Sequence, residues 1–522
     1  MPADASVSKA DHENSRWRKY QNQLWNFFNN TSVHGVKYLA EITRPYPERI
    51  LWLLSIVLSI IVCGYLISKS WDIRSSSPVI LAMDKKQRAV WDIPFPAITI
   101  CPTDRMRPTI GLTKHKTNAI HCAMNLICDK KFPVEECSNS SEIIQTLVQS
   151  SPKSDELFVT TPSLSAAIFL GLKNRTAKPI LANGGLCYSI NMLTGSAIFA
   201  NNTFHRSEKY LDYKEIVNWH IEKGYTSKNS PNYPKPALGS GGEAGMLILL
   251  KNEAAFSISK ACTFVHGFEV QVHNPVDFPG GGQKYYAPLN SMVQVFVTPE
   301  EVITDDLRSY TPEQRQCYYS DERKLKFFNV YSQTNCELEC LSEESLKSCN
   351  CVEYYLPRHK DTPVCLKKKQ VRCIGLVKEE IASASGMTRE DVHRPESGIN
   401  CKCLPSCSHV RYRYHAVHTP MERKQLEEIY REMHEVTDYE DCDFTIIQVL
   451  FTESLFIPFR RLELYGTVEF LANCGGVLGL CLGVSVLSII EILYWLLVRP
   501  FFRTPPNRST PNEAESANLT SL

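Results

Sequence analysis

The stretch CGGVLGLCLGVSVLSIIEILYW (474–495) is apolar enough for a bilayer but carries features that a simple membrane anchor does not need. It holds four glycines in its first ten residues, serines in its middle and a carboxylate, Glu491, near its end. Residues 470–490 carry no charge, and the apolar character continues to Val498, so the segment is long enough to cross a membrane. We therefore predict a span over 466–498 that has a function beyond anchoring.

A second apolar run, ILWLLSIVLSIIVCGYLIS (50–68), is uncharged throughout. It follows a polar segment and lacks a small-residue cleavage site, so we favour a retained span over a signal peptide. Two spans place both termini on one side of the membrane and the segment 69–465 on the other. The sequence therefore predicts a multi-pass membrane protein with a large domain between its spans.

The cysteines indicate which side this domain faces. Of the twenty cysteines, seventeen lie between the two runs, three lie within them, and neither tail (1–49, 499–522) has any. The dense cluster at 317–407 lacks a histidine pair at ligand spacing, and its Cys-x-Cys is a poor fit to a zinc knuckle, so disulfides are the better interpretation. We expect the domain to be extracellular and the termini cytosolic. The domain also holds glycosylation sequons at Asn139, Asn174 and Asn201, although similar matches occur in the tails.

Composition argues against several classes of protein. The chain has 57 basic and 56 acidic residues, so nothing indicates a nucleic-acid partner. We find neither a Gly-x-Ser-x-Gly elbow nor a His-Glu-x-x-His motif. GSGGEAG (239–245) lacks the Lys-Ser/Thr ending of a phosphate loop and is better interpreted as a turn before a strand. We expect no enzyme, no cofactor and no resident metal.

Alternating apolar residues predict strands within the domain. FEVQV (268–272) and VQVFV (293–297) have the period of two that a half-buried strand shows, and residues from about 90 to 300 alternate in the same way. Helix formers favour helices at 387–394 and 420–436. The C-terminal tail, 499–522, is rich in Ser, Thr, Pro and Asn and is predicted to be disordered.

The glycines and polar residues of the second span have two interpretations. Gly475, Gly479 and Gly483 are spaced by four, so they would share one helical face and allow close helix packing, as in a simple dimer. Glu491 favours a different interpretation, because a carboxylate inside a span usually faces a bundle interior or a water path. Asn473 and Ser485 are further polar groups of the same segment.

A pore needs more helices than one chain supplies. Several copies would have to assemble around their second spans to enclose a path. A ring of Glu491 side chains near the cytosolic end would then favour cations.

Several blocks in order resemble the degenerin/epithelial sodium channel family. GVS (483–485) looks like its Gly-x-Ser selectivity segment, and His34-Gly35 in SVHG looks like its motif before the first span. FPAITIC (95–101) and GLCYSIN (185–191) agree, and the cysteine-rich blocks between 314 and 407 are similar to the insect pickpocket branch. The resemblance covers residues 30–498, almost the whole chain.

This resemblance implies a fold and a function. The fold is an α+β membrane protein, with two transmembrane helices flanking a disulfide-rich domain that has a palm of strands and a helical finger and thumb. The function is that of a subunit of an amiloride-sensitive, sodium-selective channel in the plasma membrane, gated through the extracellular domain by an unknown stimulus, with a sensory role. The implied partners are related subunits in a homo- or heterotrimer, the lipid bilayer, permeating sodium ions and amiloride-type blockers.

The resemblance also assigns residues. His34 and Gly35 form a gating motif, and Gly483, Val484 and Ser485 form a selectivity filter at which the second span is broken. The pore and gate residues are Ala472, Asn473, Gly475, Gly476, Gly479 and Glu491. The implied disulfides are Cys101–Cys187, Cys317–Cys407, Cys336–Cys403, Cys340–Cys401, Cys349–Cys373 and Cys351–Cys365.

Some questions remain open at the level of sequence. The cysteines left over are Cys122, Cys128, Cys137, Cys262 and Cys442, and this odd number implies that at least one is free or bonded between chains. The rival functions are a purinergic-type two-span ligand-gated channel and a non-conducting receptor or adhesion subunit.

Overall fold

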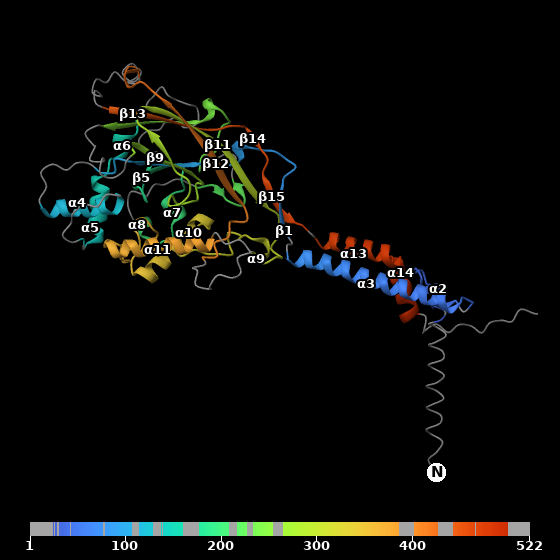
Figure 1. Cartoon of the computed structure of the whole chain (residues 1–522). Helices are drawn as coiled ribbons and strands as arrows, with labels where there is room; N and C mark the ends of the chain where they lie inside the picture. The colour runs from blue at the N-terminus through green and yellow to red at the C-terminus, as the bar shows by residue number, and fades with distance from the viewer. Residues whose placement is uncertain are drawn as a thin grey trace, which may run out of the picture. The chain divides into compact units, whose positions relative to one another are not determined.

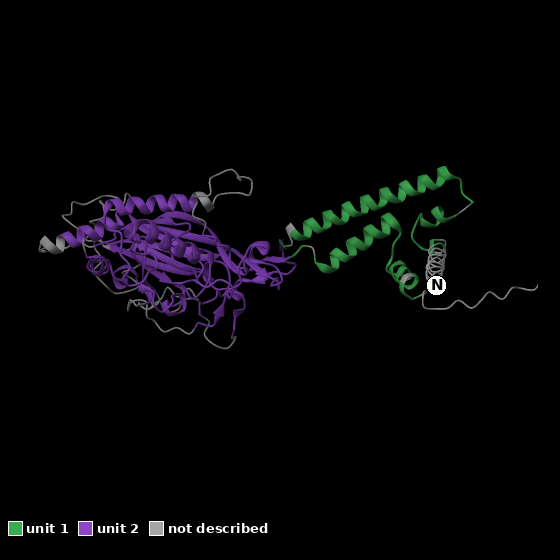
Figure 2. Cartoon of the chain, turned by 90° about the horizontal axis from the view of Figure 1, so that it is seen from below, with its two compact units in different colours: residues 1–80, 463–522 green, residues 81–462 purple. Residues whose placement is uncertain are grey.

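The chain forms two compact units, which Figure 2 shows in green (1–80 with 463–522) and purple (81–462). The computed structural model describes residues 25, 27, 28, 31–41, 43–76, 79–106, 114–128, 137, 139–159, 177–207, 217–226, 233–253, 265–385, 401–425, 428, 442–464 and 466–498. The predicted disorder of 499–522 therefore lies outside the described residues.

The first unit is helical. Its elements are α2 (Val36–Ala40), α3 (Tyr46–Ser76), α13 (Thr467–Leu482), α14 (Val486–Leu493) and a terminal π-helix (Tyr494–Val498). Helix α3 contains the predicted span 50–68 and is long and apolar enough to cross a membrane. Helices α13 and α14 pass the same test only as a pair, and the pair bends by 75° at its break.

Helices α3 and α13 run alongside one another in Figure 2 and are joined by polar and aromatic contacts. Asn473 Nδ2 donates a hydrogen bond to Ser70 Oγ at 2.9 Å. The ring of Trp71 meets Phe470 edge-on, with 5.8 Å between the ring centroids. These contacts fix which face of α13 is turned toward α3.

The second unit is built on two sheets that share a core (Figure 1). The five-stranded antiparallel sheet has the order β10-β9-β3-β5-β4. The six-stranded sheet has the order β1-β15-β11-β13-β8, with β12 pairing along the other edge of β11. The strands of these sheets are β1 (Val79–Met83), β3 (Ala97–Pro102), β4 (Lys178–Ala182), β5 (Gly185–Ile190), β8 (Met246–Glu253), β9 (Gly267–His273), β10 (Tyr285–Pro288), β11 (Ser291–Thr304), β12 (His409–Pro420), β13 (Cys442–Phe451) and β15 (Phe459–Glu463).

Apolar side chains from both sheets fill the space between them. Ile100 and Val270 come from the first sheet, and Val295 and Val449 come from the second; none is more than 1% exposed. Burying a side chain of this kind contributes about 1.5–3 kcal/mol. The predicted strands 268–272 and 293–297 lie in β9 and β11; β11 alternates as expected, whereas β9 is buried along its whole length.

Among the described residues of the second unit, four longer helices pack in two pairs (Figure 1). They are α4 (Lys114–Ile127) with α5 (Ser140–Ser150), and α10 (Gln333–Cys349) with α11 (Lys368–Ser385). The shorter helices are α6 (Ser154–Leu157), α7 (Gly195–Ile198), α8 (Phe204–Ser207) and α9 (Pro312–Arg315). The glycine-rich segment at 239–245 forms a 3-10 turn directly before β8, as predicted.

The helix predictions from sequence are tested only in part in this unit. The segment 387–394 lies outside the described residues; of 420–436 the structure describes 420–425 and 428, where Pro420 ends β12 and residues 423–425 and 428 are helical, as predicted. Helices α10 and α11 were missed. In α10, cysteines occupy positions where an apolar stripe would normally indicate a helix, whereas α11 holds one cysteine and its apolar residues follow helical spacing (Val371, Ile374, Val377 and Ile381). Helices α4 and α5 interrupt a region that we had expected to be strand-like throughout.

Disulfides tie the second unit together. The described pairs are Cys101–Cys187, Cys122–Cys137, Cys317–Cys407, Cys336–Cys403, Cys340–Cys401, Cys349–Cys373 and Cys351–Cys365. They include all six pairs that the resemblance implies. Of the five cysteines left over, two form the additional pair, Cys128 is also disulfide-bonded, Cys262 lies outside the described residues and Cys442 is buried at the start of β13.

Candidate functional site

The break between α13 and α14 occurs at the residues that were predicted to form the filter. Gly483 ends α13 with φ 66° and ψ 19°, the left-handed conformation that favours glycine. Its N–H donates to the Gly479 carbonyl at 2.9 Å. Gly483 therefore does not continue the helical face of Gly475 and Gly479, and the prediction of a shared glycine face holds only up to Gly479.

Ser485 is the N-cap residue of α14. Its Oγ accepts a hydrogen bond from the Ser488 N–H, and Ser488 Oγ accepts one from the Ser485 N–H, each at 3.2 Å. This reciprocal pattern is a capping box, which satisfies helix-terminal N–H groups that otherwise have no partner. Ser485 thus fixes where the chain resumes a helix after the break.

The His34-Gly35 motif packs directly against this break. The His34 N–H donates to the Leu482 carbonyl at 3.1 Å, and a Cβ added to Gly483 would overlap the imidazole ring of His34. Gly35 itself has φ 84°, and its Cβ would lie 3.1 Å from Ile56 of α3. Two motifs more than 440 residues apart in sequence, which we had predicted separately, therefore form one site.

Glu491 accepts hydrogen bonds from Ser32, the first residue of the SVHG block (32–35). Ser32 Oγ donates to Glu491 Oε2 at 2.8 Å, and the Ser32 N–H approaches the same oxygen at 3.3 Å. Ser32 Oγ also lies 2.9 Å from Ser488 Oγ. Sequence reasoning missed Ser32; its place two residues before His34 was the only available signal.

One face of α13 is uncovered in the single chain. Ala472, Gly475, Gly476 and Gly479 lie three to four residues apart and are exposed, so they share a face. A Cβ added to Gly475 or Gly476 would meet no described atom within 4 Å. Asn473 lies at the edge of this face, where it bonds to Ser70.

The predicted glycosylation positions are accessible where the structure describes them. Asn139 and Asn201 are exposed, and Asn139 caps α5 by accepting a hydrogen bond from the Glu142 N–H at 3.3 Å. Asn174 lies outside the described residues.

Replacing Ser32 with alanine is expected to leave the Glu491 carboxylate less firmly positioned. The change removes the hydroxyl that donates to Glu491, and a typical hydrogen bond contributes about 0.5–1.5 kcal/mol. We expect a shifted reversal potential and a smaller macroscopic current at equal surface expression, both measured by voltage clamp with sodium and potassium exchanged.

Ser32→Thr is the matched control, because it keeps the hydroxyl. It should preserve the current and the reversal potential. If Ser32→Ala behaves like Ser32→Thr, the Ser32–Glu491 contact has no role in permeation.

Comparison with known proteins shows which family and which relatives the chain is similar to. The sequence profile of the amiloride-sensitive sodium channel family matches residues 27–495. The chain is similar to pickpocket protein 28 of Drosophila melanogaster, with 29% identity over 91% of this chain and 78% of the relative. It is also similar to the sodium channel protein Nach of Drosophila melanogaster (21% identity; 92% of this chain and 88% of the relative) and to human acid-sensing ion channel 2 (22% identity; 90% and 85%).

Proposed function

The chain belongs to the amiloride-sensitive sodium channel family, and from this premise we propose that it is a subunit of a trimeric, sodium-selective, amiloride-sensitive channel of the plasma membrane. In this proposal α3 and the broken α13–α14 pair are the two spans, both termini are cytosolic, and 69–465 forms the extracellular domain through which an unidentified stimulus opens the channel. The family assignment covers the chain from residue 27 to residue 495.

The helix break at Gly483 is the observation that best supports this function. Non-helical backbone inside a membrane is tolerated only where protein or water surrounds it. Here the break falls within an otherwise apolar pair of helices and leaves Val484 in irregular backbone between them. Such a break would destabilise a helix that only anchors the protein in the membrane, whereas its exposed backbone carbonyls could line a narrow ion passage.

Selectivity follows from the chemistry of this segment in our proposal. Three chains would bring the backbone carbonyls and Ser485 hydroxyls of 483–485 around one axis. A sodium ion would exchange part of its hydration shell for these oxygens, which is how ion filters generally work. Glu491, on the cytosolic side of the break, would add negative charge that favours cations.

Current recordings test this proposal. Expression of the chain, alone and with related subunits, should give an inward current that reverses at a new potential when potassium replaces sodium and that amiloride blocks. A current evoked by nucleotides and resistant to amiloride would support a purinergic-type channel instead. No current from any subunit combination, despite surface expression, would support a non-conducting receptor.

Glycosylation tests the proposed orientation. If 69–465 is extracellular, Asn139 and Asn201 are exposed to the glycosylation machinery, and peptide N-glycosidase should increase the electrophoretic mobility of the chain. Asn201→Gln should remove part of this shift. Asn507→Gln, which removes a sequon from the proposed cytosolic tail, is the control and should change nothing. A shift lost only in the Asn507 variant would reverse the orientation.

A further inference from the structure

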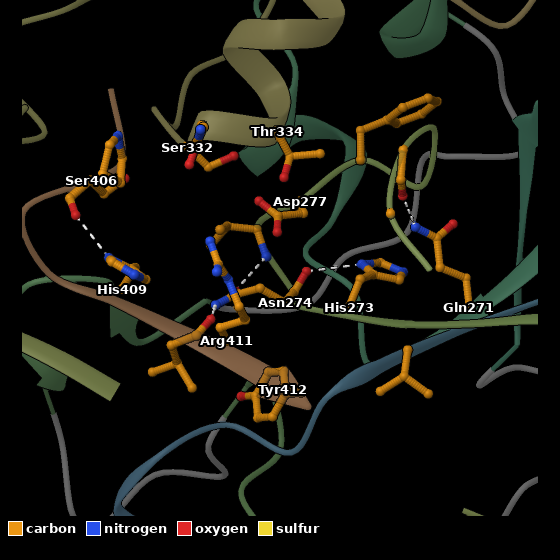
Figure 3. Close-up of a pocket in the computed structure, with 18 of the residues that line it drawn as sticks. Gln271, His273, Asn274, Asp277, Ser332, Thr334, Ser406, His409, Arg411 and Tyr412 are labelled. Carbon is orange, nitrogen blue, oxygen red and sulfur yellow. Dashed lines mark hydrogen bonds between the residues drawn. The ribbon is translucent and has the colours of Figure 1, made fainter. Parts of the chain in front are cut away.

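A cavity of about 470 Å³ opens in the second unit. Its walls come from β9, β12, the loop 274–283 and the start of α10 (Figure 3). A volume of this size lies within the range of small-molecule sites. The cavity therefore lies between strands β9 and β12 and the start of α10, a helix that the Cys349–Cys373 disulfide links to α11.

Two buried asparagines hold the walls of this cavity in place. Asn274 Nδ2 donates to the Val410 carbonyl of β12 at 2.6 Å. Asn335 of α10 is fully buried; it accepts from the Phe278 N–H and donates to the Val276 carbonyl, each at 2.9 Å. The loop is thus bonded to β12 on one side and to α10 on the other, so the cavity is preformed.

Opposite charges line the cavity without pairing. Asp277, from the loop, lies beside Ser332 and Thr334 at the start of α10, whose hydroxyls stabilise its charged form (Figure 3). Arg411, from β12, lines the same cavity. Within the described part of the chain, Arg411 forms no ion pair with Asp277 or with any other carboxylate. Arg413, two positions along the strand, also lines the cavity but pairs with Glu300 at 2.7 Å.

The two histidines in the walls are neutral at extracellular pH. Both ring nitrogens of His273 are engaged, Nδ1 with the Asn274 carbonyl at 2.9 Å and Nε2 with Thr99 Oγ1 at 2.8 Å. His409 Nδ1 lies 2.8 Å from the Ser406 carbonyl. Burial lowers the pKa of each histidine to about 4, so neither adds charge near neutral pH.

Asp277 is ionised under the same conditions. Burial raises its pKa to about 6, an effect that Glu337 of α10 increases and that Ser332, Thr334 and Arg411 oppose. Above pH 7 the cavity therefore presents one carboxylate, Asp277, and two guanidinium groups, of which Arg413 is paired with Glu300 and Arg411 forms no ion pair.

We propose that this cavity binds a small zwitterion of the amino acid or dipeptide class, with its ammonium on Asp277 and its carboxylate on Arg411. A guanidinium matches the planar geometry of a carboxylate, and charge-assisted hydrogen bonds to both ends of the ligand would join two charges that form no ion pair with each other. Ile221, Val272 and Val276 supply an apolar wall for the rest of the ligand.

Such a ligand would bridge two parts of the domain. It would contact the start of α10 through the Ser332–Thr334 side and β12 through Arg411. A ligand that prefers one arrangement of these elements shifts the population toward it, which would make the site regulatory. The inference goes beyond the proposed function, and its test is binding rather than current, so either can fail while the other stands.

The experiment measures binding to the full chain in lipid nanodiscs by titration calorimetry near pH 7.4. The probes are glycine, β-alanine, γ-aminobutyrate and glycylglycine at millimolar concentrations, with ethylamine and propionate as ligands that carry only one of the two charges. We expect saturable binding of at least one zwitterion and at least about tenfold weaker binding of both single-charge probes, since each loses a charge-assisted contact.

Variants test the assignment of each end. Asp277→Asn and Arg411→Gln should each weaken the bound zwitterion by about tenfold or more. Arg308→Gln is the control and should leave the affinity unchanged, because Arg308 does not line the cavity and pairs with Asp321 at 3.0 Å.

Three results would overturn the proposal. They are the absence of saturable binding by every zwitterion, equal binding of ethylamine or propionate, and unchanged affinity in correctly assembled Asp277→Asn and Arg411→Gln variants. The single-charge probes use the unmodified chain, so the proposal stays testable even if a variant fails to fold.

Discussion

Replacing Gly483 with alanine is expected to abolish the sodium current without removing the protein from the cell surface. Gly483 has φ 66°, a conformation that costs a residue with a side chain about 1–2 kcal/mol. The added methyl group would also overlap the ring of His34, so the ring, the backbone of the break or both must move. Because the carbonyls at this break are the proposed ion ligands, even a small displacement should stop permeation. Voltage clamp combined with surface biotinylation measures the effect.

Two further variants separate this mechanism from general damage. Gly64→Ala in α3 is the matched control, because Gly64 has no described neighbour within 4 Å of the added Cβ, and it should conduct normally. Adding His34→Ala to Gly483→Ala removes the overlapping ring and should restore part of the current, as expected for two residues in contact. Normal current from Gly483→Ala would show that the break and the His34 contact do not matter for conduction.

Patterns among neighbouring residues predicted a membrane-length helix and strands of the sheets. The apolar run 50–68 lies inside α3, and the alternation at 293–297 continues through β11. Helix α10 was missed because disulfides at Cys336 and Cys340 provide much of what an apolar stripe usually provides, whereas the apolar stripe of α11 was present in the sequence and was overlooked. In the chain-entropy description, a disulfide that closes a loop of 61 or 67 residues contributes about 4 kcal/mol to stability. A helix that carries such disulfides can therefore be stable with fewer buried apolar side chains.

The site was predictable only in pieces. The Gly-x-Ser and His-Gly motifs were both found, but nothing local indicates that His34 touches Gly483 or that Ser32 holds Glu491. Such contacts depend on how α2, α3 and the broken helix pair pack, which neither periodicity nor motif spacing encodes. The charges at Asp277 and Arg411 are likewise far apart in sequence, and only the fold brings them to one cavity.

Replacing Ala472 with phenylalanine is expected to give a standing sodium current that needs no stimulus. Ala472 shares the uncovered face of α13 with Gly475, Gly476 and Gly479, whereas Phe470 and Asn473 turn toward α3. In the proposed trimer this small-residue face is where the second spans of three chains converge when the channel is closed. Overpacking a tight contact costs about 1–3 kcal/mol, and here the cost would fall on the closed state.

The size of this effect follows from how the strain is divided between the two states. If the open state has more room at this level, a bias of about 1.4 kcal/mol already changes the open-to-closed ratio tenfold, and three copies of the substitution add to it.

Ala472→Gly and Ala472→Ser should keep the channel closed at rest, because they add little or no volume. Leu471→Phe introduces the same ring at the preceding residue, about 100° around the helix from Ala472, and it should not open the channel. The discriminating measurement is the amiloride-sensitive holding current of these variants at equal surface density. A silent Ala472→Phe channel that still opens normally to its stimulus would mean that this face points to lipid, and the closed contact would then have to lie elsewhere on α13.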